Sequence, residues 1–320
     1  YGTGAQRLVN GPPFSAPNQY CFPIWVIRST GMVGNVRRSV EAEVTKNKLE
    51  INVTAAVASD AGVWGGGAFS VCGHNHLMVT PVGTRIMQGG NSYPCHDGGW
   101  EVCDRDAAGR VADSCLAGGC LPGITTTGDE LIPPGGGGDL QGVPPSSKTG
   151  TFKDIWEVLG FADEALMREA YNITKFNTRA GASITDGCGF YEYVGDLGKD
   201  GNTATQLSIT DLPDSSRGIL WVRGPFDGIG QGCFKGLLFV DGEMTVSNRI
   251  WILGAIMVKG DTVNYDGVTQ NAPGAGRGMH MRGNGDLLYS SEMLQYVMQK
   301  ISSATSGLKQ ISWREIDIHN

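Results

Sequence analysis

The sequence lacks a run of 18 apolar residues, a cluster of basic residues and the short motifs of common catalytic sites. Without the apolar run, no segment is typical of a membrane-spanning helix. The absence of basic clusters, together with a net charge of −7, argues against nucleic acid and anionic membrane surfaces as partners. There is no Gly-x-Ser-x-Gly elbow, Walker loop or His-Glu-x-x-His, and no cysteine pair has the spacing of a zinc finger or a haem attachment site.

Glycine and cysteine are plentiful. The 49 glycines show no Gly-X-Y period, which excludes collagen and favours turn-rich β structure. The eight cysteines, an even number in Gly-rich and polar sequence, indicate disulfides and an oxidising, extracellular or cell-surface location. The disulfide candidates are Cys21, Cys72, Cys95, Cys103, Cys115, Cys120, Cys188 and Cys233. Connectivity stays open, with Cys115–Cys120 and Cys95–Cys103 favoured as the closest pairs.

A repeat lies between Gly218 and Gly260. Its leading glycines are 18 residues apart twice (236 − 218 and 254 − 236), and each copy has large or apolar residues, Val, a charged residue and Gly. The copies are Gly218–Gly224, Gly236–Gly242 and Gly254–Gly260. Short apolar runs bounded by glycine predict strands, and stacked copies would place equivalent residues beside one another.

The repeat predicts a mainly β fold, a β-solenoid (β-helix) with coils of about 18 residues. The alternative is a β-sandwich whose strands share this spacing. The charges that close the copies, Arg223, Asp241 and Lys259, alternate in sign, so stacking would bring opposite charges together at an exposed corner.

The rest of the chain is organised around this repeat. The predicted regions are an N-terminal β region leading into a first coil (1–76), a Cys/Gly-rich insertion (77–150), a helical hairpin (151–175), the solenoid core (176–289), and a capping helix with a strand-like tail (290–320). Thr151 with Asp154, Asp163 and Ser290-Ser291 are the predicted helix caps. The tail is expected to pair with its own sheet or with that of a neighbour.

Two metal sites compete with simpler interpretations. Asp104, Asp106 and Asp113 resemble part of a Ca²⁺ loop but lack its closing Glu, so the alternative is a solvated loop and no cofactor. A zinc cluster can be drawn from Cys72, His74, His76, Cys95 and His96, but oxidised cysteines and polar histidines explain the same residues.

The candidate paired acids for polysaccharide cleavage are Asp227, Asp241 and Glu243. The favoured explanation of these residues is that they are solvated at the corners of the coils.

Several motifs in a shared order resemble the extracellular region of PilX-like, pilin-anchored pilus-assembly or minor-pilin proteins of Gram-negative bacteria. They are the region from Ser29-Thr30-Gly31 to Val44, Cys72-Gly73-His74-Asn75-His76 followed by Thr80-Pro81, Leu121 to Gly128, Trp156 to Phe161, the glycine-bounded copies, and Leu287-Leu288-Tyr289-Ser290-Ser291. The resemblance implies an N-terminal hydrophobic helix that anchors the protein and packs into a pilus. The numbered chain begins at Tyr1 without such a helix, so we expect an anchoring or targeting segment to be removed or to precede it.

These observations favour an extracellular structural or adhesive protein, a pilus-associated or filament-forming subunit without catalytic chemistry. Its expected partners are further copies, other pilus or filament subunits, or a surface glycan, with membrane contact only through an absent anchor. Trp313, Ile316 and Ile318 in the tail are the candidate subunit contacts. The alternative is a polysaccharide-binding or polysaccharide-cleaving protein.

Overall fold

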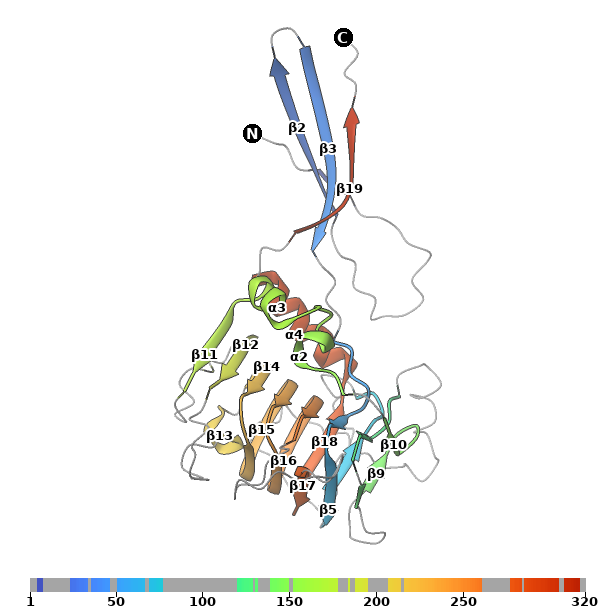
Figure 1. Ribbon diagram of the computed structural model, residues 1–320, viewed down its shortest axis with the longest axis vertical. Coiled ribbons are helices and arrows are strands. Elements are labelled where there is room, and N and C mark those ends of the chain that lie inside the picture. Colours follow the sequence, from blue (N-terminus) through green and yellow to red (C-terminus); the bar gives the residue numbers. More distant parts are fainter. Residues whose placement is uncertain are drawn as a thin grey trace, which may run out of the picture. The chain divides into compact units, whose positions relative to one another are not determined.

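A computed structural model describes two units of the chain (Figure 1). Unit 1 comprises Tyr1–Leu49 and Ser302–Asn320, and unit 2 comprises Glu50–Ile301. The described residues are 5–7, 24–33, 36–46, 51–66, 69–76, 120–128, 130–131, 139–149, 152–177, 184, 188–194, 207–213, 216–260, 277–283, 285–304 and 308–316.

Unit 1 contains one antiparallel sheet of four strands in the order β1-β2-β3-β19. The strands are β1 (Ala5–Arg7), β2 (Ile24–Val33), β3 (Val36–Lys46) and β19 (Leu308–Ile316). β2 and β3 form a hairpin in which Val33 is opposite Val36. The tail strand β19 pairs with β3, so of the two predicted partners, a sheet of its own chain or that of a neighbour, the structure shows the first.

Unit 2 is built on one large sheet in which every described strand pair is parallel. Its main path runs β10-β7-β4-β16-β15-β14-β12-β11, and the other strands branch from this path. The strands are β4 (Val57–Ser59), β5 (Gly62–Gly66), β6 (Phe69–Cys72), β7 (Ile124–Thr126), β8 (Glu130–Leu131), β9 (Asp139–Gln141), β10 (Ser146–Lys148), β11 (Ile173–Phe176), β12 (Cys188–Tyr193), β13 (Leu207–Ser208), β14 (Arg217–Val222), β15 (Phe226–Val240), β16 (Met244–Val258), β17 (Arg277–Arg282) and β18 (Gly285–Tyr289).

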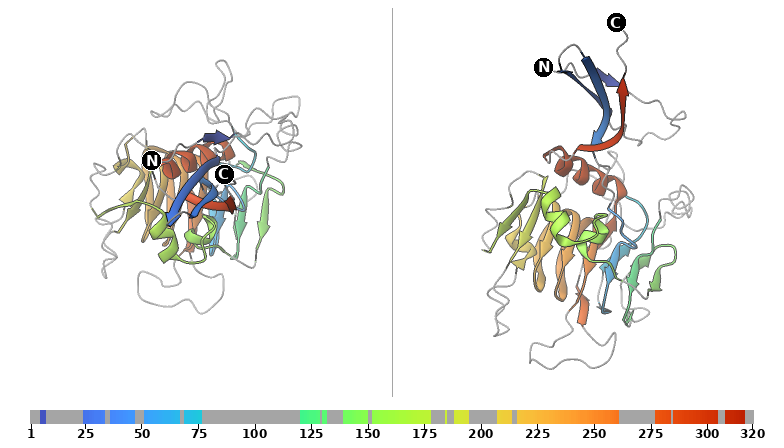
Figure 2. Two further views of the ribbon diagram at one scale, coloured as in Figure 1. Left: turned by 90° about the horizontal axis from the view of Figure 1, so that it is seen from above. Right: turned by 45° about the horizontal axis from the view of Figure 1, so that its top comes forward.

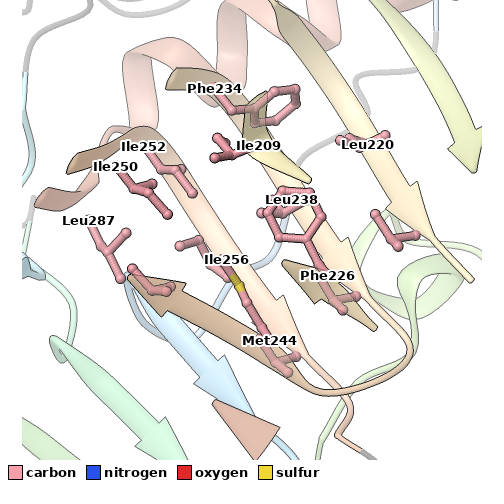
Figure 3. Packing of buried hydrophobic residues seen from close by; sticks show 14 of the residues in the cluster. Ile209, Leu220, Phe226, Phe234, Leu238, Met244, Ile250, Ile252, Ile256 and Leu287 are labelled. Carbon is pink, nitrogen blue, oxygen red and sulfur yellow. The ribbon is translucent and has the colours of Figure 1, made fainter. Parts of the chain in front are cut away.

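The repeat forms the centre of this sheet. Gly218 of β14 is the register partner of Gly236 in β15, which in turn partners Gly254 in β16. The predicted placement of equivalent residues side by side is therefore correct. In Figure 3, Leu220, Leu238 and Ile256 from these three strands belong to one buried cluster.

The central strands are buried on both faces. Leu220, Leu238 and Ile256 pack into the main core, while the alternating residues Trp221 and Phe239 are also fully buried. The Phe239 ring lies 5.9 Å from that of Phe152, just before the first helix of the hairpin. Burial on both faces explains why these strands are continuous apolar runs and do not alternate with polar residues.

Helices gather on one side of the unit 2 sheet (Figures 1 and 2). They are α2 (Ile155–Val158), α3 (Glu164–Ala170) and α4 (Ser291–Ala304), and a 3₁₀ turn, η4, covers Ile209–Asp211. The expected caps at Asp163 and Ser290 are present, because Asp163 Oδ1 accepts from the Leu166 N–H (2.8 Å) and Ser290 Oγ accepts from the Met293 N–H (3.1 Å). For α2 the capping pair is Asp154 with Glu157, whose carboxylate accepts from the Asp154 N–H at 2.8 Å, in place of the predicted Thr151 with Asp154.

The prediction of a β-solenoid with coils of about 18 residues is wrong. The parallel sheet has two ends, β10 and β11, and its strands do not follow one another in chain order: β4 from the N-terminal part lies next to β16. The 18-residue register holds only across β14, β15 and β16, and apolar runs buried beneath helices produce the same sequence pattern as buried coils. The fold of unit 2 is a mainly parallel sheet with few helices, closer to an α/β arrangement. The β-sandwich alternative requires antiparallel strands, which unit 2 does not show in its described part.

Residues 120–149, which the sequence assigned to an insertion, contribute β7, β8, β9 and β10 to this sheet. The three-residue strand β7 pairs with β4, and Thr126 Oγ1 donates to the Ala61 carbonyl at 2.6 Å. This part of the chain therefore extends the parallel sheet beyond β4.

Candidate functional site

A cluster of charged side chains lies where the central strands of unit 2 end. Arg223, Asp241 and Lys259 directly follow β14, β15 and β16, whose carboxyl ends are adjacent. Arg223 Nη1 lies 3.2 Å from Asp241 Oδ2, which confirms the predicted pairing of opposite charges for these two residues. Lys259 Nζ lies 2.7 Å from Asp154 Oδ1, so its closest described carboxylate comes from the helical hairpin.

Glu192, near the end of β12, is the centre of this cluster. Only 2% of its side chain is exposed. Arg168 of α3 donates two hydrogen bonds to its carboxylate, each 2.6 Å long, and Arg223 Nε donates a third at 3.2 Å. Lys175 Nζ lies 3.5 Å from Glu192 Oε2. Burial alone would raise the pKa of Glu192, but the bonds and charges of Arg168, Lys175 and Arg223 outweigh it and lower that pKa.

Trp221 also belongs to this cluster. Its ring is fully buried, with the Arg223 guanidinium 4.0 Å and the Arg168 guanidinium 5.0 Å from the ring centroid. Its indole N–H donates to Asp241 Oδ2 at 3.0 Å. The two arginines therefore interact with an aromatic face as well as with carboxylates, which the planar guanidinium allows because it can stack on a ring and donate several N–H bonds at once.

The geometry of the cluster attaches α3 to the sheet. Arg168 pairs within its helix with Glu164 at 2.7 Å and reaches the sheet through Glu192, while Arg223 reaches back to Glu164 at 3.0 Å. The helix and two strand ends are thus joined by charge-assisted bonds. We interpret the cluster as a structural clasp.

The candidate paired acids do not form a pair at this site. Asp241 accepts bonds from Trp221 and Arg223, and burial raises the pKa of its carboxyl group although Arg223 opposes the rise. Asp227 lies within β15, where its register partner is Thr245. Glu243 precedes β16, and its carbonyl accepts from the Phe226 N–H at 3.0 Å.

The structure describes only some of the predicted metal ligands. No group of His, Cys, Asp or Glu among the described residues is arranged to hold a metal ion. Cys72 is disulfide-bonded, and its sulfur lies 3.6 Å from His74 Nδ1, so it is not available as a zinc thiolate. The predicted calcium ligands Asp104, Asp106 and Asp113 lie outside the described residues, as do Cys95 and His96.

The described cysteines have two chemical states. Cys72, Cys120 and Cys233 take part in disulfides. Cys188 is a free thiol, so its prediction as a disulfide partner is wrong; burial, only partly opposed by Arg217 and Lys300, raises its pKa to about 11. Cys188 lies at the start of β12 under α4, with its sulfur 4.0 Å from the Val297 carbonyl oxygen. Four further cysteines lie outside the described residues: Cys21, Cys95, Cys103 and Cys115. Each of the two favoured pairs includes at least one of them, so both pairings stay predictions.

The predicted subunit contacts fall on the edge strand of unit 1. Trp313 and Ile316 belong to β19, where they are register partners of Ala42 and Ser39 in β3. Ile318 lies outside the described residues. Glu41 of β3 binds Arg28 of β2 at 3.2 Å and Arg314 of β19, so ion pairs join the three strands.

Sequence reasoning missed the centre of the charged cluster. Glu192 lies in Phe190-Tyr191-Glu192-Tyr193, and a single acid inside an apolar strand is a signal that a cationic partner is nearby. Its partner Arg168 lies in the predicted helical hairpin, but no spacing in the sequence links the two.

Comparisons with known proteins give little support to any family. No family model and no curated protein matches the chain. Among solved structures, the competence-associated pilin ComZ from Thermus thermophilus has a TM-score of 0.19 and 8% identity, over 99% of this chain and 88% of that one. A TM-score this low does not show a shared fold, and the resemblance to PilX-like proteins stays a prediction. The described helices include none that is both long and apolar enough to cross a membrane.

Proposed function

We propose that the protein is an extracellular structural subunit without catalytic chemistry, pilus-associated or filament-forming, and that unit 1 is its assembly module. The observation that carries the proposal is the incomplete pairing of the unit 1 sheet among the residues that the structure describes. On the β19 side, the described strands end with β19 itself. On the other side, β1 pairs only with Ile24–Val26, so Ile27–Val33 of β2 has no further described strand beside it.

Exposed apolar side chains accompany this open edge. Ile27 is 48% and Met32 73% exposed, and Val40 of the neighbouring strand is 39% exposed. An edge with unpaired backbone groups and apolar side chains is a template for a strand from another chain. β-Strand addition between copies is the assembly mode that this supports.

The two edges favour an open assembly. β2 and β19 differ in sequence, so contact between β19 of one copy and β2 of the next is heterologous and repeats head to tail. Such contacts generate filaments when the rotation between copies does not close a ring.

The test is electron microscopy with size-exclusion chromatography and light scattering on the non-reduced protein. We expect filaments or concentration-dependent oligomers from the unchanged chain. Met32→Lys adds a charge to the β2 edge at an exposed position and should shift the population to monomer, by about tenfold or more in apparent association constant. Val143→Lys, at a 58% exposed site in unit 2, is the matched control and should assemble normally. A monomeric unchanged chain at every concentration would refute self-assembly.

A further inference from the structure

A row of register partners crosses five neighbouring strands of unit 2, of which β15, β16, β17 and β5 are labelled in Figure 1. Asp227 of β15 partners Thr245 of β16, which partners His280 of β17, which partners Trp64 of β5. Leu131 of β8 is next to Trp64 and extends the row. Neighbouring strands are about 4.8 Å apart, so the row presents one residue per strand at a regular spacing.

Four members of the row, Asp227, Thr245, His280 and Trp64, face away from the core. The residues that precede these four, Phe226, Met244, Met279 and Val63, all belong to the buried hydrophobic cluster. Because side chains alternate along a strand, Asp227, Thr245, His280 and Trp64 lie on the opposite face. Their exposure agrees, since Trp64 is exposed and the other three are half-buried.

Trp64 places a partly exposed aromatic ring on this strand face. Its side chain is 39% exposed, and the His280 ring packs edge-on against it with centroids 4.2 Å apart. Gly62 and Gly66, two residues away on either side, carry no side chain that could cover the indole along the strand. A Cβ at Gly66 would lie 3.7 Å from the ring, which shows how close a covering group could come.

We propose that this row binds an extended, uncharged polysaccharide. The indole face suits the C–H faces of a sugar ring, and the Asp227 carboxylate and Thr245 hydroxyl suit its hydroxyl groups. The strand spacing of about 4.8 Å is close to the length of one sugar unit in an extended chain, so successive units can meet successive strands. The net charge of −7 disfavours anionic polymers.

The site is independent of the proposed assembly module, because every residue of the row belongs to unit 2. If the protein is adhesive, this site specifies the chemical class of its ligand, an uncharged polysaccharide. Binding involves no covalent step, and the carboxylate acts as a hydrogen-bond acceptor.

The experiment is isothermal titration of the full chain with β-1,4-linked hexasaccharides of glucose, xylose and N-acetylglucosamine, with tryptophan fluorescence as a second readout. We expect saturable binding of at least one of these sugars. Trp64→Ala should weaken it by about tenfold or more, as for an anchoring aromatic residue, and Asp227→Asn should weaken it less.

Gly66→Gln tests the same site without changing Trp64. Its side chain would cover the indole, and no strained φ is recorded at Gly66, so affinity should fall while the fold is kept. Leu166→Ala, at a 47% exposed position of α3, is the control and should bind normally. Circular dichroism verifies that each variant is folded.

Three results would overturn the proposal. One is the absence of heat or fluorescence change with all three hexasaccharides at millimolar concentration. Another is undiminished binding by folded Trp64→Ala and Gly66→Gln. The third is preferential binding of a hexagalacturonate, which would contradict an uncharged ligand. Assembly is measured separately, so loss of sugar binding with intact oligomers leaves the function proposed for unit 1 in place.

Discussion

At the scale of single residues, Glu192 shows how one charge is accommodated in a buried sheet. Its neighbours in β12, Phe190, Tyr191 and Tyr193, are buried apolar or aromatic residues. Burying an unpaired carboxylate costs several kcal/mol, and the two arginines and Lys175 offset that cost. The stability of this region therefore depends on the completeness of the cluster.

Replacing Glu192 by glutamine should lower the free energy of unfolding by about 2–3 kcal/mol, because Arg168 and Arg223 lose their shared carboxylate. The arginines are partly exposed, so the loss should be smaller than for a fully buried pair. Urea unfolding followed by circular dichroism measures it. Glu169→Gln makes the same chemical change at an exposed position of α3 and should have little effect; equal losses from both substitutions would contradict the clasp.

The pKa of Glu192 sets the pH range of this contribution. Because that pKa is lower in the folded state, the stabilisation is complete above about pH 4.5, the ordinary value, and is lost as the pH falls through the lower folded pKa. The stability difference between the unchanged chain and Glu192→Gln should therefore be constant at neutral pH and shrink below about pH 4.5. A constant difference down to pH 3 would show that the carboxylate does not titrate in this way.

At the scale of elements, stacked glycines allow the central strands to approach. Gly218, Gly236 and Gly254 have φ angles of 136°, 132° and 141°, in a region that other residues rarely adopt. A Cβ on Gly236 would lie 2.0 Å from the Gly218 carbonyl oxygen, and one on Gly254 would lie 2.0 Å from that of Gly236. The register of three strands thus depends on the absence of side chains at these positions.

Gly236→Ala should lower the free energy of unfolding by more than about 2 kcal/mol or prevent soluble expression, because the new methyl group meets backbone atoms that cannot move independently. Thermal unfolding and soluble yield measure the effect. Gly31→Ala, where no atom lies within 4 Å of the added Cβ, is the control and should be tolerated. A tolerated Gly236→Ala would mean that the strands are farther apart than described.

The same elements show what the sequence could and could not predict. The spacing of Gly218, Gly236 and Gly254 correctly predicted strands side by side, because pairing of consecutive copies leaves a period in the chain. It could not predict that β4 joins β16, since contacts between distant segments leave no period. In the row from Asp227 to Trp64, the first two members are 18 residues apart (245 − 227) and follow the period, but Trp64 comes from a distant segment, so the complete row was missed for the same reason.

At the scale of the whole molecule, the two units divide the chain unequally. Unit 2 has its own buried core, with members from β4 to β18, as an independently folding domain requires. Unit 1 takes its strands from both ends of the numbered chain. The two proposed activities, assembly and glycan binding, belong to different units.

A fragment of residues 50–304, which keeps α4 whole, should therefore be a folded monomer that binds the hexasaccharides as well as the full chain does. It should no longer self-associate, because it lacks β2, β3 and β19. Light scattering and isothermal titration of the two proteins give the comparison. Oligomers of the fragment would move the assembly surface to unit 2, and an unfolded fragment would show that unit 2 depends on unit 1.

The strands of the unit 1 sheet come from both ends of the numbered chain, which has a consequence for the newly made protein. Because synthesis runs from the N-terminus, β2 and β3 are made first, and β19 is made only after every described strand of unit 2. The sheet that we propose as the assembly module is therefore completed only after unit 2 has been synthesised. Under that proposal, the order of synthesis delays self-assembly until the proposed glycan-binding unit has been made, and chains that have not reached β19 lack one of the two proposed edges.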